Sequence, residues 1–270
     1  MRIVTGQLTA SNYKSEHDVA VYETMPGGPF FTNKDVPDMV RPTKGFVLTK
    51  THCTGYCSVC APEFYIVNAT EFTQSCFEGD SFLTDEGDET VYSYSPDLVQ
   101  RAVHIIRDPF DNIVSRFHLM RENFSRRNQT ELVVRHPKTK AGFRSYCKFM
   151  GESFYKEHLE LFDEVIKDIP CFSDFFRYIQ WHNLAFTTTE DLRSSTLIIH
   201  YEDYLTKLDQ TKDALLEFLN QDGIRDAPPF ETGKSYREYF TKDEIQAVSR
   251  MFSKLASQKT WDQTSHYFVQ

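Results

Sequence analysis

The stretch VHIIRDPFDNIVSRF, residues 103–117, decides the fold of this 270-residue chain. A run of apolar residues, Val103 to Ile106, stops abruptly at Arg107-Asp108-Pro109. Asp108 is a favoured N-cap and Pro109 suits the first helical position, so a helix is predicted to begin here. Apolar residues then recur at helical spacing, namely Ile113, Val114, Phe117, Met120 and Phe124. The stretch therefore predicts a strand, a tight turn and the N-terminus of a helix.

The same stretch has the chemistry of a phosphate-binding site. Ser115 lies about two helical turns beyond Asp108, on the side where Arg107 leaves the strand. The guanidinium group of an Arg offers a planar fork of donors, and a helix N-terminus adds free N–H groups and the positive end of a dipole. An ordinary strand–turn–helix with a surface Arg is the alternative interpretation.

Composition limits the partners of the chain. The net charge of −9 argues against general nucleic-acid binding. An anionic ligand is still compatible with it, because residues 101–127 hold six basic residues against three acidic ones. No apolar run approaches the about 20 residues of a membrane span, and the first residues lack the apolar core of a signal peptide.

Predicted strands alternate with predicted helices along the chain, which indicates an α/β fold. We expect a three-layer sandwich with a central parallel sheet, built as one domain over residues 1–270. Residues 53–97 are predicted to be a cysteine-rich loop insertion, and 25–43 and 78–97 to be long surface loops. The further strands are expected at 45–52 and 195–203, and the further helices at 152–168, 173–186, 207–221 and 241–256.

Polar residues end each of the three strands: Lys50 and His52, then Arg107, then Tyr201-Glu202-Asp203. Ligands of parallel sheets bind at the carboxyl ends of strands, so these residues are expected at one site. Lys50 and His52 point to the same side of an extended chain. A His can take a proton from an acceptor hydroxyl while a Lys stabilises developing charge, although a structural His is the alternative.

The Arg107 segment resembles the 3′-phosphate-binding segment of the sulfotransferase family. In that family an Arg closing a strand and a Ser on the next helix hold the 3′-phosphate of 3′-phosphoadenosine 5′-phosphosulfate. The resemblance implies that Arg107 and Ser115 bind this phosphate. A Lys-x-His at a strand end supplies the family's catalytic base and a charge-stabilising Lys, which implies these roles for His52 and Lys50.

Two further segments are similar to the family. LIIHYEDYL (197–205) is similar to its strand ending in Tyr-Glu-Asp, which implies that Tyr201 lies near the adenine. GKSYREYFT (233–241) is similar to its basic segment over the 3′-phosphate, which makes Lys234 and Arg237 candidate cofactor-binding residues. The resemblance implies a P-loop-containing nucleotide hydrolase-like fold, 3′-phosphoadenosine 5′-phosphosulfate as co-substrate, and no metal.

One element of the family is not found in the sequence. Sulfotransferases begin with a strand and a Gly/Ser/Thr-rich loop whose N–H groups cradle the 5′-phosphosulfate. IVTGQLTASNY (3–13) resembles the segment that comes after this loop and its helix in some members, so we expect an N-terminally truncated chain whose activity is in doubt. The missing piece is a candidate carrier of a membrane anchor.

The cysteines allow three interpretations. Cys53, Cys57 and Cys60 have the spacing of radical S-adenosylmethionine enzymes, which would bind an iron–sulfur cluster. Zinc is a second alternative, with His52 and Cys76 nearby. We prefer disulfides, because six cysteines suit an oxidising compartment and sequons begin at Asn68, Asn123 and Asn128. These features favour the Golgi lumen over the cytoplasm.

The predicted activity is therefore transfer of a sulfonate group to an acceptor hydroxyl, with a carbohydrate as the favoured acceptor. A catalytically inactive, sulfotransferase-like binding module and a radical iron–sulfur enzyme are the alternatives. Residues 135–148 carry five basic residues and no acidic one, which suggests a surface for an anionic glycan or acidic peptide. A solvated loop is the simpler interpretation of that segment.

Overall fold

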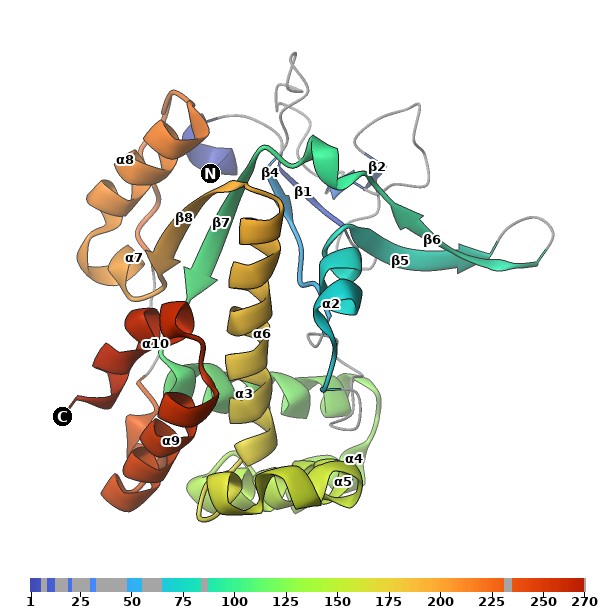
Figure 1. The fold of residues 1–270 in the computed structure, drawn as a ribbon, viewed down its shortest axis with the longest axis vertical. Helices are drawn as coiled ribbons and strands as arrows, with labels where there is room; N and C mark the ends of the chain where they lie inside the picture. Colours follow the sequence, from blue (N-terminus) through green and yellow to red (C-terminus); the bar gives the residue numbers. More distant parts are fainter. Residues whose placement is uncertain are drawn as a thin grey trace. The chain divides into compact units, whose positions relative to one another are not determined.

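The computed structural model describes residues 1–5, 9–12, 19–20, 30–32, 48–54, 65–83, 87–230 and 235–269 (Figure 1). The chain divides into two compact units. Unit 1 comprises residues 1–54, 69–105 and 188–232, and unit 2 comprises 55–68, 106–187 and 233–270. Each unit is described by itself below.

Unit 1 contains all the described sheets. In one, β1 (Thr9–Ser11) pairs in parallel with β4 (Leu48–Lys50), and Ser11 lies opposite Lys50. On the other side of β1 lie β3 (Phe31–Thr32) and β2 (Val19–Ala20), both paired antiparallel. A second sheet joins β7 (Arg101–Ile106) to β8 (Ser195–His200), and their arrows point the same way in Figure 1.

The three predicted strands are therefore present. Hydrogen bonds among the described residues place β4 with β1 and place β7 with β8, in separate sheets. A single central sheet and a three-layer sandwich stay predictions. The second sheet is covered by α8 (Leu208–Leu219), because Leu215 and Leu219 pack against Ile199 of β8. Two short helices, α1 (Arg2–Thr5) and α7 (Asp203–Thr206), also belong to unit 1.

The expectation of a surface loop over 78–97 is wrong. The helix α2 (Ala69–Cys76) leads into a hairpin of β5 (Glu78–Leu83) and β6 (Glu89–Ser93), followed by the 3-10 helix η2 (Pro96–Leu98). The hairpin contains an irregularity between Glu78 and Ser81, and Phe82 pairs with Thr90. Its strands are acidic and carry few apolar residues, so the alternation that predicts a strand is absent from the sequence.

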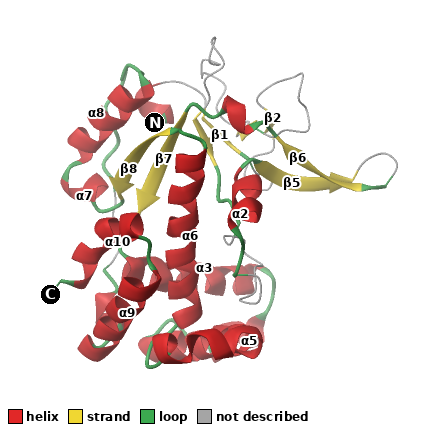
Figure 2. Cartoon of the chain, viewed as in Figure 1, coloured by secondary structure: helices red, strands yellow, loops and turns green. Residues whose placement is uncertain are grey.

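Among the described residues of unit 2, the regular elements are helices apart from the last residue of β7 (Figure 2). The predicted helix at 152–168 is the second half of a longer one, α5, which begins where Thr139 caps the N–H of Gly142. Basic residues and a glycine in the first turns of α5 interrupt the helical pattern, so the sequence did not predict that the helix begins at Lys140. The helices are α3 (Pro109–Arg126), α4 (Thr130–Arg135), α5 (Lys140–Ile166), α6 (Phe172–Asp191, to residue 187 in this unit), α9 (Lys242–Leu255) and α10 (Gln258–Thr264), with the 3-10 turns η3 (Arg237–Tyr239) and η4 (Ser265–Phe268).

Aromatic side chains form the core of unit 2. Phe110 contacts Phe175 and Phe240 edge-on, with ring centroids 5.5 and 5.0 Å apart. Such tilted pairs stabilise beyond their buried area by about 1 kcal/mol each. Because Phe110 is the second residue of α3, this packing fixes the helix N-terminus against α6 and the segment before α9. Further fully buried members are Phe117, Phe143, Tyr146, Phe154 and Phe252.

Candidate functional site

The turn between β7 and α3 is held from both ends. Asp108 is the N-cap, and its carboxylate accepts from the backbone N–H groups of Phe110 and Asp111 at 2.8 and 3.4 Å. The Tyr178 hydroxyl, from α6, donates to the carbonyl oxygen of Arg107 at 2.7 Å. The predicted cap and helix start are therefore confirmed, and the backbone of Arg107 is anchored.

The carboxyl group of Asp108 lies in an unusual electrostatic setting. Burial raises its pKa from 3.8 to about 6, and the nearby charge of Asp111 contributes to the rise. The backbone hydrogen bonds of the cap and the guanidinium of Arg237 oppose this rise. Near neutral pH the carboxyl group is therefore mostly ionised, but it takes up a proton at a higher pH than an exposed Asp does.

Arg237 reaches the same helix end from a distant part of the sequence. Its Nη1 lies 3.6 Å from Oδ2 of Asp108, and its guanidinium lies over the Phe110 ring, 5.1 Å from the centroid. The preceding Tyr236 donates its backbone N–H to Asp111 at 2.6 Å. The Nη2 of Arg237 is buried and has no hydrogen-bond partner among the described residues. The guanidinium thus keeps donor capacity for an anion at the N-terminus of α3.

The other phosphate candidates differ in what the structure describes. Arg107 and Ser115 are both half-buried, the first in the turn and the second about two turns along α3. Lys234 lies outside the described residues. Tyr201, in unit 1, is half-buried at the end of β8, where its ring meets Phe230 edge-on at 5.3 Å.

The Lys50–His52 segment lies in unit 1 and is also anchored. Lys50 is exposed at the end of β4, and His52 is half-buried. The Thr51 hydroxyl donates to the carbonyl oxygen of Cys76 at 3.0 Å. Cys53 forms a disulfide with the same Cys76. Sequence reasoning proposed disulfides here without the pairing, and it missed the role of Thr51.

The cysteine pairing bears on the two metal alternatives. The Cys53–Cys76 disulfide removes one of three thiolates that an iron–sulfur cluster would need, and it removes Cys76 from a zinc site. A second disulfide joins Cys147 of α5 to Cys171. Cys57 and Cys60 lie outside the described residues. The preferred interpretation, disulfides, is supported.

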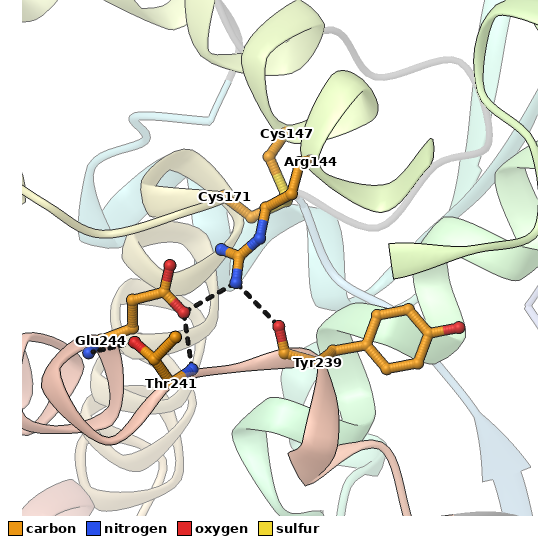
Figure 3. A network of polar contacts seen from close by, with 6 residues as sticks. All are labelled: Arg144, Cys147, Cys171, Tyr239, Thr241 and Glu244. Atoms are coloured by element: carbon orange, nitrogen blue, oxygen red, sulfur yellow. Dashed lines mark hydrogen bonds and ion pairs between the residues drawn. A yellow bond between two sulfur atoms is a disulfide. The ribbon is translucent and has the colours of Figure 1, made fainter. Parts of the chain in front are cut away.

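The basic segment 135–148 is partly neutralised within unit 2. Arg144 donates to the Glu244 carboxylate at 2.7 Å and to the Tyr239 carbonyl oxygen at 2.8 Å (Figure 3). Glu244 is also the third residue of α9, and it forms a capping box with the N-cap residue Thr241. Lys140 lies 3.8 Å from Glu238. Arg144 therefore has a structural role, whereas Lys138 and Lys148 are exposed.

A buried polar cluster beneath α3 was not predicted. Arg116 and Asp174 form an ion pair of 2.9 Å at 7% and 1% side-chain exposure. The Arg116 guanidinium also donates to the Tyr65 hydroxyl at 2.7 Å, and Arg177 lies over the Tyr65 ring. Burial raises the pKa of Tyr65 to about 12. The signal in the sequence was an Arg on the apolar face of α3, between Ile113 and Phe117, which requires a buried partner.

These features define a mixed α/β protein in which the N-terminus of α3 is capped by Asp108 and approached by Arg237. Residues 97–227 match the family model of the sulfotransferase domain, a range that holds β7, α3, β8 and α8. This match covers just under half of the chain. It supports the sulfotransferase family and a transferase enzyme. No curated protein and no solved structure matches the chain.

Within the described residues, no helix is both long and apolar enough to cross a membrane. The matched range includes Arg107, Ser115 and Tyr201. It leaves out Lys50, His52, Lys234 and Arg237. The roles of all seven residues remain predictions.

Proposed function

We propose that this protein transfers the sulfonate group of 3′-phosphoadenosine 5′-phosphosulfate to an acceptor hydroxyl of a carbohydrate. One observation carries the proposal. The range that matches the sulfotransferase domain contains a helix N-terminus whose capping residue follows Arg107 directly and pairs with Arg237. Such an end, with two guanidinium groups, suits a phosphate dianion.

The proposed role of the α3 N-terminus is to hold the 3′-phosphate of the donor. Arg107, Ser115 and Arg237 supply donors. The Nη2 of Arg237, which has no hydrogen-bond partner in the described part of the chain, is the atom best placed to donate to the phosphate. The raised pKa of Asp108 supports this role, because a carboxyl group that protonates near pH 6 can become neutral beside a phosphate. These residues account for the 3′ half of a donor site.

The proposed transfer is an in-line displacement at sulfur. His52 takes the proton of the acceptor hydroxyl as the oxygen attacks the sulfonate sulfur. The bond from sulfur to the 5′-phosphate oxygen breaks, and adenosine 3′,5′-bisphosphate leaves with the electron pair. Lys50 stabilises the negative charge on the bridging oxygen and the sulfonate. The sulfate ester and the bisphosphate are the products.

The proposed location is the lumen of the Golgi apparatus. Two disulfides among the described residues suit an oxidising compartment. Asn68 and Asn128 are exposed and accessible for glycosylation, whereas Asn123 is half-buried within α3. A mobility shift after glycosidase treatment, lost in Asn68→Gln/Asn128→Gln, would support this location. A protein secreted without any glycan on these residues would contradict it.

Transfer of radiolabelled sulfonate tests the activity. The full chain is incubated with labelled 3′-phosphoadenosine 5′-phosphosulfate and unsulfated oligosaccharides, with phenols and a tyrosine peptide as competing acceptor classes. We expect label on the oligosaccharides and a loss of about 100-fold or more in kcat for His52→Asn. Lys50→Met is expected to lower kcat with little change in donor affinity. Binding of adenosine 3′,5′-bisphosphate without transfer would instead identify an inactive binding module.

The acceptor surface can be tested at Lys138 and Lys148. Both are exposed, so charge reversal there leaves the Arg144–Glu244 pair intact. If the segment binds an anionic glycan, Lys138→Glu/Lys148→Glu raises acceptor KM several-fold and leaves donor KM unchanged. An unchanged acceptor KM would remove this segment from the proposal.

A further inference from the structure

The C-terminal end of α2 is a junction of four segments of unit 1. Three side chains donate to one atom, the carbonyl oxygen of Cys76: the Thr51 hydroxyl at 3.0 Å, the Asn12 amide at 3.2 Å and the Tyr94 hydroxyl at 3.4 Å. They come from the ends of β4, β1 and β6. Asn12 is fully buried, so its side chain is held by packing as well as by hydrogen bonds.

The residue after His52 is fixed covalently to this junction. Cys53 is joined by its disulfide to Cys76, and its backbone N–H donates to the Thr51 hydroxyl oxygen at 3.3 Å. Its φ of 52° lies in the left-handed region, which a residue other than glycine adopts only when its surroundings determine it. His52 is therefore flanked by two residues that are both tied to Cys76.

The backbone of Lys50 is fixed by the neighbouring strand. The N–H of Asn12 donates to the Lys50 carbonyl oxygen at 3.1 Å, just after the last parallel pair, Ser11 with Lys50. Ser11 is fully buried as well. The end of β1 thus sets the position at which Lys50 leaves β4.

We infer that Thr51, Asn12 and the Cys53–Cys76 disulfide are positioning residues that hold Lys50 and His52 in their reactive arrangement. The inference rests on the proposed function, which gives Lys50 and His52 their roles. Positioning of this kind matters because a displacement of about 1 Å at a reacting group can lower a rate about 100-fold. The disulfide also makes the arrangement dependent on an oxidising compartment.

The test follows the His52 ring directly, without requiring turnover. The full chain is labelled with ¹³C-histidine, and the Cε1–H peak of His52 is assigned from its loss in His52→Asn. We expect Cys53→Ser/Cys76→Ser and Thr51→Val to shift or broaden this peak, and Thr51→Ser to restore it. The matched control is Cys147→Ser/Cys171→Ser, which removes the disulfide of unit 2 and is expected to leave the peak in place.

Kinetics with the donor and an oligosaccharide acceptor add a second readout. Cys53→Ser/Cys76→Ser and Thr51→Val are expected to lower kcat about tenfold or more, while their affinity for adenosine 3′,5′-bisphosphate changes less than about twofold. An unmoved His52 peak in Thr51→Val, or an equal shift in Thr51→Ser, overturns the inference even if the cysteine variant fails to fold. A wild-type chain without sulfonate transfer, but with the expected peak shifts, overturns the proposed function and leaves the positioning role standing.

Discussion

At the scale of single residues, the α3 N-terminus brings together a half-buried carboxyl group and a half-buried guanidinium group. Asp108 caps the helix, yet burial raises its pKa to about 6. Arg237 neutralises it over a distance of 3.6 Å while its Nη2 remains without a partner among the described residues. A phosphate at this position would accept a hydrogen bond from the guanidinium group, and its negative charge would raise the pKa of the Asp108 carboxyl group further.

The Asp108 carboxyl group predicts a specific pH dependence of stability. Because its pKa is raised in the folded protein, the folded state binds the proton more tightly than the unfolded chain. Its ionisation therefore lowers the free energy of unfolding above pH 6, by about 3 kcal/mol at most, and this loss is recovered as the pH falls from 6 to 4. Asp108→Asn keeps a good N-cap and should be the more stable protein at pH 8.

Urea denaturation of wild type and Asp108→Asn at pH 8 and pH 5 measures this effect. We expect the stability gap to shrink at the lower pH. His104 acts in the opposite sense, since burial lowers its pKa to about 4 and its stabilisation is lost as the pH falls below 6.5. The difference between the two proteins cancels that contribution. A gap that widens on acidification would contradict the assignment.

Arg237 is predicted to contribute to anion binding. Arg237→Ala should weaken binding of adenosine 3′,5′-bisphosphate about tenfold or more, because it removes charge-assisted donors at the helix end. Arg126→Ala is the matched control, since that side chain is 74% exposed on the same helix and pairs only loosely with Glu122. Calorimetry of all three proteins gives the comparison. Equal losses in both variants would indicate a general charge effect and contradict a specific site.

At the scale of elements, most helices were predicted correctly, whereas the β5–β6 hairpin and the start of α5 were missed. The start of α3 and the helices predicted at 207–221 and 241–256 all follow local sequence rules, and the structure confirms them. The β5–β6 hairpin and the first turns of α5 do not follow such rules. Glu78–Leu83 lacks the alternation of apolar and polar residues typical of a strand, and Gly142 disfavours a helix. Gly142 is there for a local reason, since a Cβ would clash with the carbonyl group of Pro137 in the turn just before α5.

The ion pair between α3 and α6 makes a prediction at this scale. Asp174→Ala leaves the buried guanidinium group of Arg116 without its carboxylate partner, which should lower the free energy of unfolding by about 3–5 kcal/mol. The double variant Arg116→Met/Asp174→Leu replaces the pair with apolar residues of similar size and should recover most of the loss. Guanidinium denaturation measures both. A single variant as stable as wild type would show that the pair is unimportant.

At the scale of the whole molecule, the sequence predicted three strands that are followed by polar residues. The structure contains these strands, and the polar residues lie at or just after the ends of β4, β7 and β8. The sequence did not predict the pairing of cysteines, because spacing along the chain does not determine which thiols approach in space. The resemblance implied that Arg237 lies over the same phosphate as Arg107, but the sequence did not predict its pairing with Asp108, which depends on the tertiary packing around Phe110. The placement of Arg107 needed only local rules, because cap, proline and helical periodicity lie within fifteen residues.

The Cys147–Cys171 disulfide predicts a stability effect in unit 2. It closes a loop with a sequence separation of 24, so its removal should lower the free energy of unfolding by about 3 kcal/mol through the unfolded chain. Cys147→Ser/Cys171→Ser therefore unfolds at lower denaturant concentration, although it should leave the His52 peak unchanged. A midpoint equal to that of wild type would contradict a stabilising role.

The discrimination between two sulfonate donors tests the central claim most directly. The measurement is the ratio of kcat/KM for 3′-phosphoadenosine 5′-phosphosulfate to that for adenosine 5′-phosphosulfate, which lacks the 3′-phosphate. If the Arg107 turn binds that phosphate, the wild-type ratio is about 100 or more, and Arg107→Ala lowers it toward one. Transfer from neither donor, or a high ratio that Arg107→Ala leaves unchanged, would contradict the account.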